Sequence, residues 1–412
     1  MGQPRVVNSG VDTLVVNVYY TDLGHPIRCD IDGPLAIQLD GWKRAAQELG
    51  ESFITPWVFN NASLQMQPNG AGHGQWPWML KTPDITLYIS QGKWNGVGAV
   101  RLSSQYLWSC KSLRDALTLL STFLNEVFGQ VMHLQPSEVH LCADVAGWTD
   151  IDTLDRRINF VSRSRKRATH FVPDWDIDLH VNEHSFGLKE TGFDFSKRGA
   201  LSCTIYDKTR EMKQSGKEWF TDIWRLNGWD ESKDGTVWRI EFKFKREALH
   251  ELQQGEEFWG IENAFDLPER LPVLWAYAAG HVQGSESDEP PDGWLRCVVP
   301  TSDKNRARWP TNPAWKIVQG AFLKEQAQPE EMGKLVRKRR EEHNVQKGLE
   351  AIIGYATSLS SWIGDDLAEP EVDLSMFLHW LAEHGQDYLE RKELDFGEEV
   401  QRKRVKFGLQ AS

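Results

Sequence analysis

The sequence lacks the features that would place the protein in a membrane or stabilise it with disulfide bonds. No apolar run approaches the about 20 residues that a membrane-spanning helix needs. The N-terminal segment MGQPRVVNSG has no apolar core of the kind that a signal peptide carries. The five cysteines form no CxxC pair and no spacing typical of a metal site. We therefore expect reduced thiols, a cytoplasmic protein and no membrane partner.

An excess of positive charge is also missing. The net charge of −12 means that the chain as a whole does not attract polyanions, so nucleic-acid binding would depend on a local basic patch. One dense basic run exists, and no acidic residue interrupts it as far as Val172: Arg156, Arg157, Arg163, Arg165, Lys166 and Arg167. Such residues hold the phosphate backbone. We predict that this run binds DNA, with a solvated helix face as the alternative. A second run, Lys334–Arg340, fits either role on a C-terminal helix.

Several common catalytic signatures are absent or lack their context. No His-hydrophobe-His pair occurs, and the glycine-rich stretch NGAGHG is not followed by the Lys-Ser/Thr of a phosphate-binding loop. The stretch HVNEH at His180–His184 fits the HxxEH pattern of inverted zinc peptidases, which requires a helix. The residues before it alternate like a strand, so we do not favour a zinc peptidase.

The hydrophobic patterns predict an α+β fold with a largely antiparallel sheet. Helices are predicted at Pro34–Leu49, Ser112–Phe128 and Asp152–Ser162, and a helical C-terminal region follows. We divide the chain into an N-terminal α/β part (1–138), a catalytic part (139–283), a connecting segment (284–328) and the helical C-terminal region (329–412).

Three alternating segments place polar residues on one face, because successive side chains of a strand point to opposite sides. The segments are Val139–Val145, Leu201–Lys208 and Val237–Lys245. If they share a sheet, one face collects His140, Asp144, Tyr206, Lys208, Arg239 and Glu241. Carboxylates and an imidazole suit Mg²⁺ or Mn²⁺, a tyrosine supplies an oxygen nucleophile, and cations stabilise a phosphoryl group in the transition state. Alternatively, the face is a solvated surface whose charges pair across strands.

Three motifs on these segments occur in a definite order: HLCADVAGW (His140–Trp148), TIYDKTRE (Thr204–Glu211) and VWRIEFKFKREAL (Val237–Leu249). Together they resemble the replication-initiation-factor family, which contains rolling-circle plasmid replication initiators and related relaxases of conjugative elements. The resemblance covers roughly Val139 to Leu249. The sequence departs from the family at His140, where the family has the first of two acidic residues.

The resemblance implies site-specific DNA nicking and joining that starts rolling-circle replication or transfer of a mobile element. Tyr206 would be the nucleophile, giving a 5′-phosphotyrosyl link and a free 3′-hydroxyl. Asp144 and Glu241 would bind Mg²⁺ or Mn²⁺, with His140 as a further ligand. Lys208 and Arg239 would stabilise the transition state.

The implied partner is single-stranded or locally melted DNA at an origin. The resemblance also allows recruitment of a helicase or polymerase, and a homodimer. The alternative is a DNA-binding or recruitment protein of the same ancestry that does not cleave, a hypothesis that the substitution at His140 favours.

Overall fold

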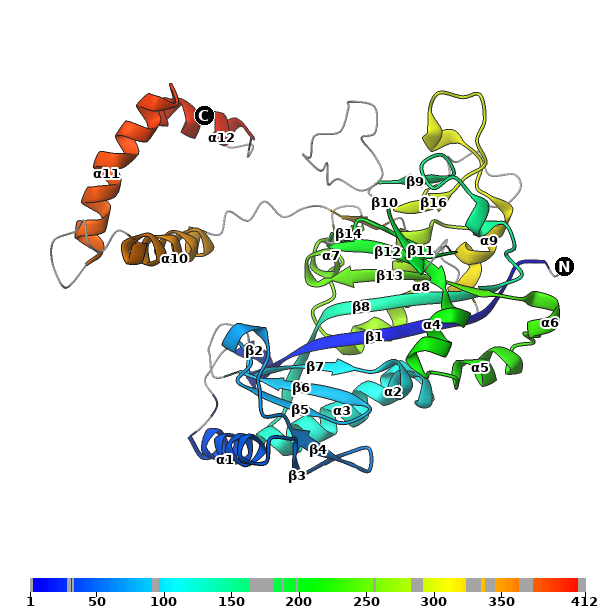
Figure 1. Cartoon of the computed structure of the whole chain (residues 1–412), viewed down its shortest axis with the longest axis horizontal. Coiled ribbons are helices and arrows are strands. Elements are labelled where there is room, and N and C mark those ends of the chain that lie inside the picture. Colours follow the sequence, from blue (N-terminus) through cyan, green and yellow to red (C-terminus); the bar gives the residue numbers. More distant parts are fainter. Residues whose placement is uncertain are drawn as a thin grey trace. The chain divides into compact units, whose positions relative to one another are not determined.

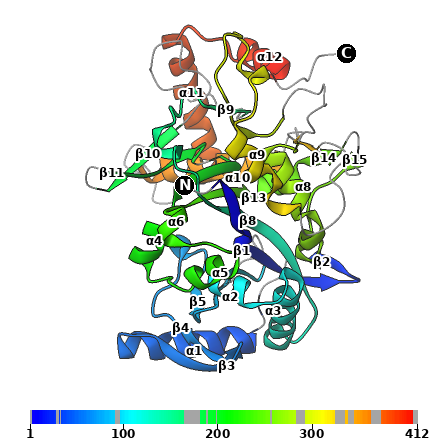
Figure 2. The same ribbon diagram turned by 90° about the vertical axis from the view of Figure 1, so that its right-hand side faces the viewer.

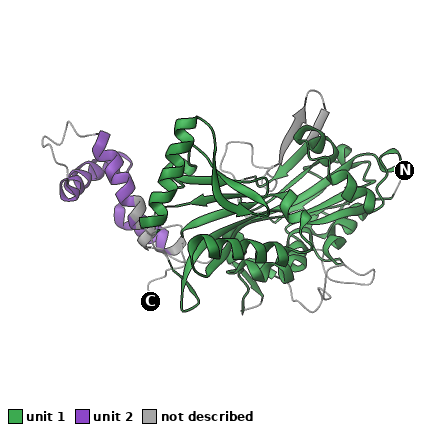
Figure 3. Ribbon diagram, turned by 90° about the horizontal axis from the view of Figure 1, so that it is seen from below, with its two compact units in different colours: residues 1–338 green, residues 339–412 purple. Residues whose placement is uncertain are grey.

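The structure is a computed structural model, and it describes residues 3–27, 31, 33–90, 96–163, 181–186, 189–197, 199–254, 257–282, 292–323, 335–337, 345–362 and 373–406. The chain divides into two compact units, Met1–Lys338 and Arg339–Ser412 (Figure 3). In the described part of the chain, no helix is both long and apolar enough to cross a membrane.

An antiparallel sheet of twelve strands, counted over the described residues, forms the centre of the first unit (Figure 1). The N-terminal strand β1 (Arg5–Asp22) lies in its middle and pairs along most of its length with β8 (Met132–Ala146). In spatial order the strands are β10 (Val181–Phe186), β11 (Lys189–Phe195), β12 (Leu201–Asp207), β13 (Val237–Lys245), β8 (Met132–Ala146), β1 (Arg5–Asp22), β7 (Gly98–Leu102), β6 (Ile85–Ile89), β5 (Trp78–Lys81), β4 (Ala62–Met66) and β3 (Phe53–Phe59), and β2 (His25–Ile27) pairs with β1. The fold is therefore α+β with a largely antiparallel sheet, as the sequence predicts.

One face of this sheet, the core face, is covered by helices. Leu14, Leu141 and Phe242 lie on it and are completely buried. The covering helices are α1 (Gly33–Leu49), α2 (Ser104–Ser109), α3 (Leu113–Phe128), α8 (Leu267–Ala279) and α9 (Pro313–Gln319). Edge-to-face packing of Phe242 on Trp275 of α8, with ring centroids 5.3 Å apart, is typical of this layer. A single large hydrophobic core thus fixes the sheet from one side.

The opposite face, here called the polar face, carries Asp144, Tyr206 and Glu241. A second, smaller hydrophobic cluster covers one end of it, where Val237 and Ala146 are paired neighbours. The cluster comes from α4 (Lys208–Ser215), α5 (Phe220–Leu226) and the segment before α6 (Glu231–Asp234), which are labelled in Figure 2. Its aromatic members include Phe220, Trp224 and Trp229. The short helices between β12 and β13 therefore close only part of the polar face.

Among the described residues, two smaller sheets are separate from the twelve-stranded one. A three-stranded sheet consists of β14 (Leu252–Gln254), β15 (Glu257–Phe258) and β17 (Leu335–Arg337), and β9 (Phe160–Ser162) pairs with β16 (Leu295–Cys297). Helix α7 (Arg246–His250) follows β13 directly. The second unit contains α10 (Val345–Trp362), α11 (Leu374–Arg391) and α12 (Phe396–Lys406).

Several predictions about single elements can be compared with this arrangement. The helices at Pro34–Leu49 and Ser112–Phe128 are confirmed, and the Ser112 side chain caps α3 by accepting the Asp115 backbone N–H. The helix at Asp152–Ser162 is wrong: only Ile151–Thr153 forms a short 3-10 turn, and Phe160–Ser162 pairs as a strand. Part of the second basic run is also a strand, because Leu335–Arg337 pairs with β14. Val181–Phe186 is a strand, which removes the helical context that a zinc peptidase needs.

Gly192 of β11 allows the close approach of backbone beside Tyr206. The two residues are paired, and a Cβ on Gly192 would lie 2.6 Å from the Tyr206 Cβ and 2.5 Å from the Ile205 carbonyl oxygen. Gly192→Ala should therefore lower the free energy of unfolding by about 1–3 kcal/mol, measured by urea denaturation. Gly41→Ala is the matched control because its Cβ would meet no atom within 4 Å inside α1, and it should stabilise the helix slightly. Equal stability of the two variants would contradict the close approach.

Candidate active site

The three motif strands lie side by side in the order β12, β13, β8, which confirms the prediction that they share a sheet. Their register places Tyr206 opposite Arg239 and Arg239 opposite Asp144. Glu241 is two residues from Arg239 and points to the same side. The polar side chains therefore come together on the polar face, as the alternation predicts.

Asp12 of β1 joins this group through a β-bulge. The pairing of β1 with β8 shifts register between Val11 and Thr13, and Asp12 is the additional residue. Without the bulge, Asp12 would share the core face with Leu14 and Val16, since all three have even numbers. The bulge turns its carboxylate to the polar face, in keeping with the use of bulges to redirect side chains next to functional sites.

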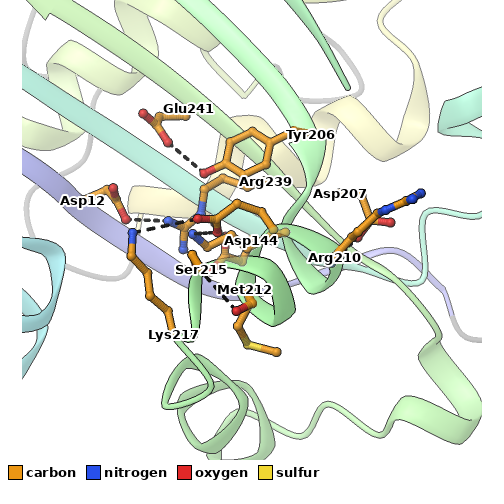
Figure 4. Close-up of polar contacts among 12 residues, drawn as sticks. Asp12, Asp144, Tyr206, Asp207, Arg210, Met212, Ser215, Lys217, Arg239 and Glu241 are labelled. Atoms are coloured by element: carbon orange, nitrogen blue, oxygen red, sulfur yellow. Dashed lines mark hydrogen bonds and ion pairs between the residues drawn. The ribbon is translucent and has the colours of Figure 1, made fainter. Parts of the chain in front are cut away.

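Arg239 is the centre of a buried ionic cluster (Figure 4). Its Nε donates to Asp144 Oδ1 at 2.6 Å, its Nη2 to Asp144 Oδ2 at 2.8 Å and its Nη1 to Asp12 Oδ1 at 2.5 Å. Trp224 Nε1 at 2.9 Å and Asn8 Nδ2 at 3.1 Å also donate to Asp144 Oδ2. The side chains of Arg239 and Asp144 have no exposed surface. Two carboxylates fix one guanidinium, as expected for a buried cation.

Aromatic rings cover this cluster from the solvent side. The Phe220 ring lies 4.6 Å from the guanidinium carbon of Arg239 and 4.7 Å from Lys208 Nζ. Lys208 is buried as well, donates to Glu211 Oε2 at 2.5 Å and lies 5.7 Å from the centre of the Tyr206 ring. The two cations that the sequence places in the site are thus present beside Tyr206, but both are buried and engaged by carboxylates.

A chain of hydrogen bonds leads from Tyr206 towards the open part of the polar face. The Tyr206 hydroxyl donates to Glu241 Oε2 at 3.1 Å. The other Glu241 oxygen lies 2.8 Å from His140 Nδ1, and His140 Nε2 lies 2.8 Å from Glu138 Oε1. The side chain at the far end of this path, Glu138, is 23% exposed, compared with 15% for Glu241 and 6% for His140. The chain therefore connects the phenol to solvent.

The surroundings determine the protonation of these groups. Burial alone would raise the pKa of Glu241, but the hydrogen bond and charge of His140, with the charges of Arg239 and Lys208, lower that pKa to about 2. Burial and the negative charge of Glu241 hold the pKa of Tyr206 well above its usual range. The hydrogen bond from His140, with further contributions from Lys243 and Arg101, lowers the pKa of Glu138 to about 2. Near neutral pH, a protonated phenol therefore faces an ionised carboxylate.

The arrangement does not fit a divalent ion between Asp144 and Glu241. Four N–H donors already occupy the Asp144 carboxylate, which is fully buried. Both ring nitrogens of His140 lie at hydrogen-bond distance from carboxylates, too close for an ion to lie between them. Among the described residues, no group of three or more His, Cys, Asp or Glu side chains could hold a metal. The ligand roles expected of Asp144 and His140 are thus not supported by their contacts.

The predicted DNA-binding run is only partly described. Arg165, Lys166 and Arg167 lie outside the described residues. Arg157 is exposed, and Arg163 donates its backbone N–H to the Trp294 carbonyl oxygen. Arg156 instead lies over the Phe193 ring, 4.7 Å from its centre. A guanidinium held on a ring in this way contributes to packing on the sheet.

Sequence reasoning missed several residues of the site. Asp12 was missed because its alternation assigns it to the core face. Asn8 lies far from the motifs in sequence. Trp224 lies between the second and third motifs, but its indole hydrogen bond depends on how α5 folds back over the sheet. Lys243 could have been found, since it shares the alternating face of Glu241. Its side chain is 35% exposed and lies 3.8 Å from Glu138, so it is an accessible cation of the polar face.

Comparisons with known proteins give limited similarity. No protein-family model matches the chain. The uncharacterized protein ORF430 of Pseudomonas phage Pf1 is 28% identical over 154 residues, which are 34% of this chain and 35% of that protein. The match thus spans about a third of that relative's length. A rolling-circle replication initiator from Geobacillus stearothermophilus aligns with 79% of this chain and 100% of its own, with 13% identity and a TM-score of 0.40. This is a loose likeness in the arrangement of elements.

Replacing Asp144 distinguishes its two proposed roles, that of ion-pair partner of Arg239 and that of metal ligand. Asp144→Ala leaves the buried Arg239 with Asp12 as its remaining carboxylate in the cluster, and breaking a buried pair costs about 3–5 kcal/mol. We expect a loss of unfolding free energy of that order in urea denaturation. Asp152→Ala, at an exposed position, should change it by less than about 0.5 kcal/mol.

Calorimetric titration with Mn²⁺ tests the other role of Asp144, that of a metal ligand. An Asp144→Ala variant as stable as the wild type, but unable to bind Mn²⁺ that the wild type binds, would mean that Asp144 is a metal ligand rather than the partner of Arg239.

Proposed function

We propose that this protein nicks and rejoins single-stranded DNA with Tyr206 as the nucleophile, and thereby starts rolling-circle replication or transfer of a mobile genetic element. The observation that carries this proposal is the hydrogen bond from the Tyr206 hydroxyl to Glu241, located where the polar face passes from its covered end to its open part. The resemblance of the three motifs supports the assignment, because the strands that carry them meet at this point.

The geometry supplies an acceptor for the phenol proton. Because the pKa of Tyr206 is high, its phenolate does not accumulate before the reaction. The proton therefore moves to Glu241 as the phenol oxygen bonds to phosphorus, and the bond from phosphorus to the 3′-oxygen breaks. The departing 3′-oxygen takes up a proton from solvent and becomes a hydroxyl, and Glu241 returns the phenol proton to solvent. The product is a 5′-phosphotyrosyl link, and the reverse step rejoins the strand.

The buried cations act on this step indirectly, through Glu241. Arg239 and Lys208 lower the pKa of Glu241 and so keep it ionised as an acceptor. They do not reach the open part of the polar face, so we assign them to positioning rather than to contact with the phosphate. Lys243, on the same strand as Glu241 and partly exposed, is the cation that a bound phosphodiester would meet.

The remaining parts of the proposal rest on the motif resemblance. These are single-stranded or melted DNA at an origin as substrate, recruitment of a helicase or polymerase, and a homodimer. The requirement for Mg²⁺ or Mn²⁺ also stays a prediction, which the contacts of Asp144 and His140 do not support.

One observation favours a second function, a DNA-binding or recruitment protein without cleavage activity. Arg239 and Lys208 are both sequestered in ion pairs, so the cations that would stabilise a pentavalent phosphorus are held away from the open part of the face. Under this alternative, the Tyr206 hydroxyl only donates a hydrogen bond to Glu241, which contributes about 1 kcal/mol to the free energy of unfolding.

Tyr206→Phe separates the two functions. The variant loses the nucleophilic oxygen and keeps the ring, so we expect wild-type DNA affinity and complete loss of covalent attachment. The assay uses labelled single-stranded oligonucleotides that tile both strands of the DNA flanking the gene, with Mg²⁺, Mn²⁺ or EDTA. Adducts are detected on denaturing gels, and mass spectrometry locates the modified residue.

Tyr355→Phe, at an exposed position of α10, is the control and should form the adduct as the wild type does. An adduct on a residue other than Tyr206 would overturn the assignment of the nucleophile. If the wild type binds these oligonucleotides and forms no adduct under any of the three conditions, the protein is the non-cleaving alternative.

A further inference from the structure

The polar face continues well beyond Tyr206 across the N-terminal half of the sheet. The strands β8, β1, β7, β6 and β5 follow β13 without interruption. Helices α1 and α3 contribute to the hydrophobic cluster of the core face, on the other side of these strands. From Val15 on, the polar-face side chains of β1, β7, β6 and β5 are partly or fully exposed, with the small Ala99 as the exception. They are Val15, Asn17, Tyr19, Met79, Lys81, Thr86, Tyr88 and Arg101. These eight residues are called the open face.

Cations occur at intervals across the open face and its continuation on β13. The register places Lys245, Glu138, Val15, Arg101, Thr86 and Lys81 in one row that runs across the strands. With strands about 4.8 Å apart, Arg101 and Lys81 are about 10 Å from each other, and Arg101 and Lys245 about 14 Å. Glu138 is the carboxylate in this row, and the charges of His140, Lys243 and Arg101 offset it. In a chain of net charge −12, such a row is a local cationic strip.

Aromatic rings lie beside the cations. Tyr88 is next to the row on β6, and the Trp76 ring lies 6.1 Å from it in a tilted orientation. Tyr19 is on β1, and its hydroxyl is 3.5 Å from the Gln135 side chain. All three rings are partly exposed. Aromatic side chains on an accessible surface provide faces on which unpaired bases stack, and cations beside them hold the phosphates.

We infer that the open face is a binding track for single-stranded DNA that leads the strand to Tyr206. From β12 to β6 there are five strand intervals, about 24 Å across the sheet, and the row through Lys245 lies six residues, or about 20 Å, along β13 from Arg239, the paired neighbour of Tyr206. The track therefore runs obliquely over the sheet towards the nucleophile. Arg101, Lys81 and Lys243 contact phosphates, and Tyr88 and Trp76 stack on bases. The inference rests on the proposed function for the direction of the strand, while the binding itself depends only on the charges and rings of the open face.

The test measures binding without chemistry. Fluorescence anisotropy of a labelled 20-nucleotide oligo-dT is recorded with the Tyr206→Phe protein, which forms no adduct through that residue. Adding Arg101→Gln and Lys81→Gln should weaken binding about tenfold at 0.1 M salt. The slope of log affinity against log salt should fall by about 1.4, since each single-strand phosphate contact contributes roughly 0.7. Adding Tyr88→Ala instead should weaken binding about five- to tenfold and leave the slope unchanged, because stacking releases no counterions.

The matched control replaces two cations elsewhere, Lys43→Gln in α1 and Lys111→Gln before α3, and should bind oligo-dT as the parent does. Unchanged affinity and slope in the Arg101 and Lys81 variant would overturn the inference. If the Arg101 and Lys81 variant lost affinity equally for a 20-base-pair duplex, the inference that the open face binds single-stranded DNA would be wrong.

The two proposals fail in different ways. If the wild type forms the phosphotyrosyl adduct while the variants of the open face bind oligo-dT normally, nicking stands and the track is wrong. If no adduct forms and these variants lose affinity, the track stands and the protein binds DNA without cleaving it.

Discussion

Arg239 is completely buried in the middle of the sheet, and removing a guanidinium from water costs several kcal/mol unless its partners compensate. Here the compensation comes from Asp144 on the neighbouring strand and from Asp12 one strand further. Three central strands of the sheet therefore have to adopt one register for the cluster to form. Because the cluster is ionic and satisfied, a slip of β13 by one residue would place the charge in the hydrophobic core. The position of Tyr206 relative to Glu241 follows from that constraint.

The same cluster explains why the polar face has two parts. Near Asp144 the indole of Trp224 and the ring of Phe220 exclude water from the ion pairs. Four residues further along β13, at Lys243, the cover has ended and the face is open, since the Lys243 side chain is 35% exposed. A nucleophile needs both environments: a dry side that fixes its orientation, and an accessible side from which a substrate can approach. Tyr206 lies at this boundary, with its ring beside Lys208 and its hydroxyl directed at Glu241.

Much of this could be predicted from the sequence, because strand alternation is a strong signal when one face is buried. It identified the strands around Asp144, Tyr206 and Glu241 and assigned these three side chains to the correct face, whereas Lys208, expected at the end of the second strand, begins helix α4. Two kinds of information were not available. A β-bulge reverses the assignment of Asp12, and nothing in the local pattern marks the bulge. The choice between metal binding and ion pairing depends on distances between strands, and the sequence shows only that carboxylates and cations share a face.

That choice also explains what a histidine does at position 140. An acidic side chain at this position would add a third carboxylate beside Glu138 and Glu241, and such a cluster requires a metal ion or protonation to be stable. Histidine instead can bridge the two carboxylates, with one ring nitrogen at 2.8 Å from each. An imidazole in place of a carboxylate removes one negative charge, and its pKa is raised by the two hydrogen bonds despite the opposing effect of burial. The histidine thereby supplies within the protein part of the positive charge that a bound cation would otherwise provide. On this face, the side chains of His140, Arg239 and Lys208 keep Glu241 ionised, so that it can accept the hydrogen bond of Tyr206.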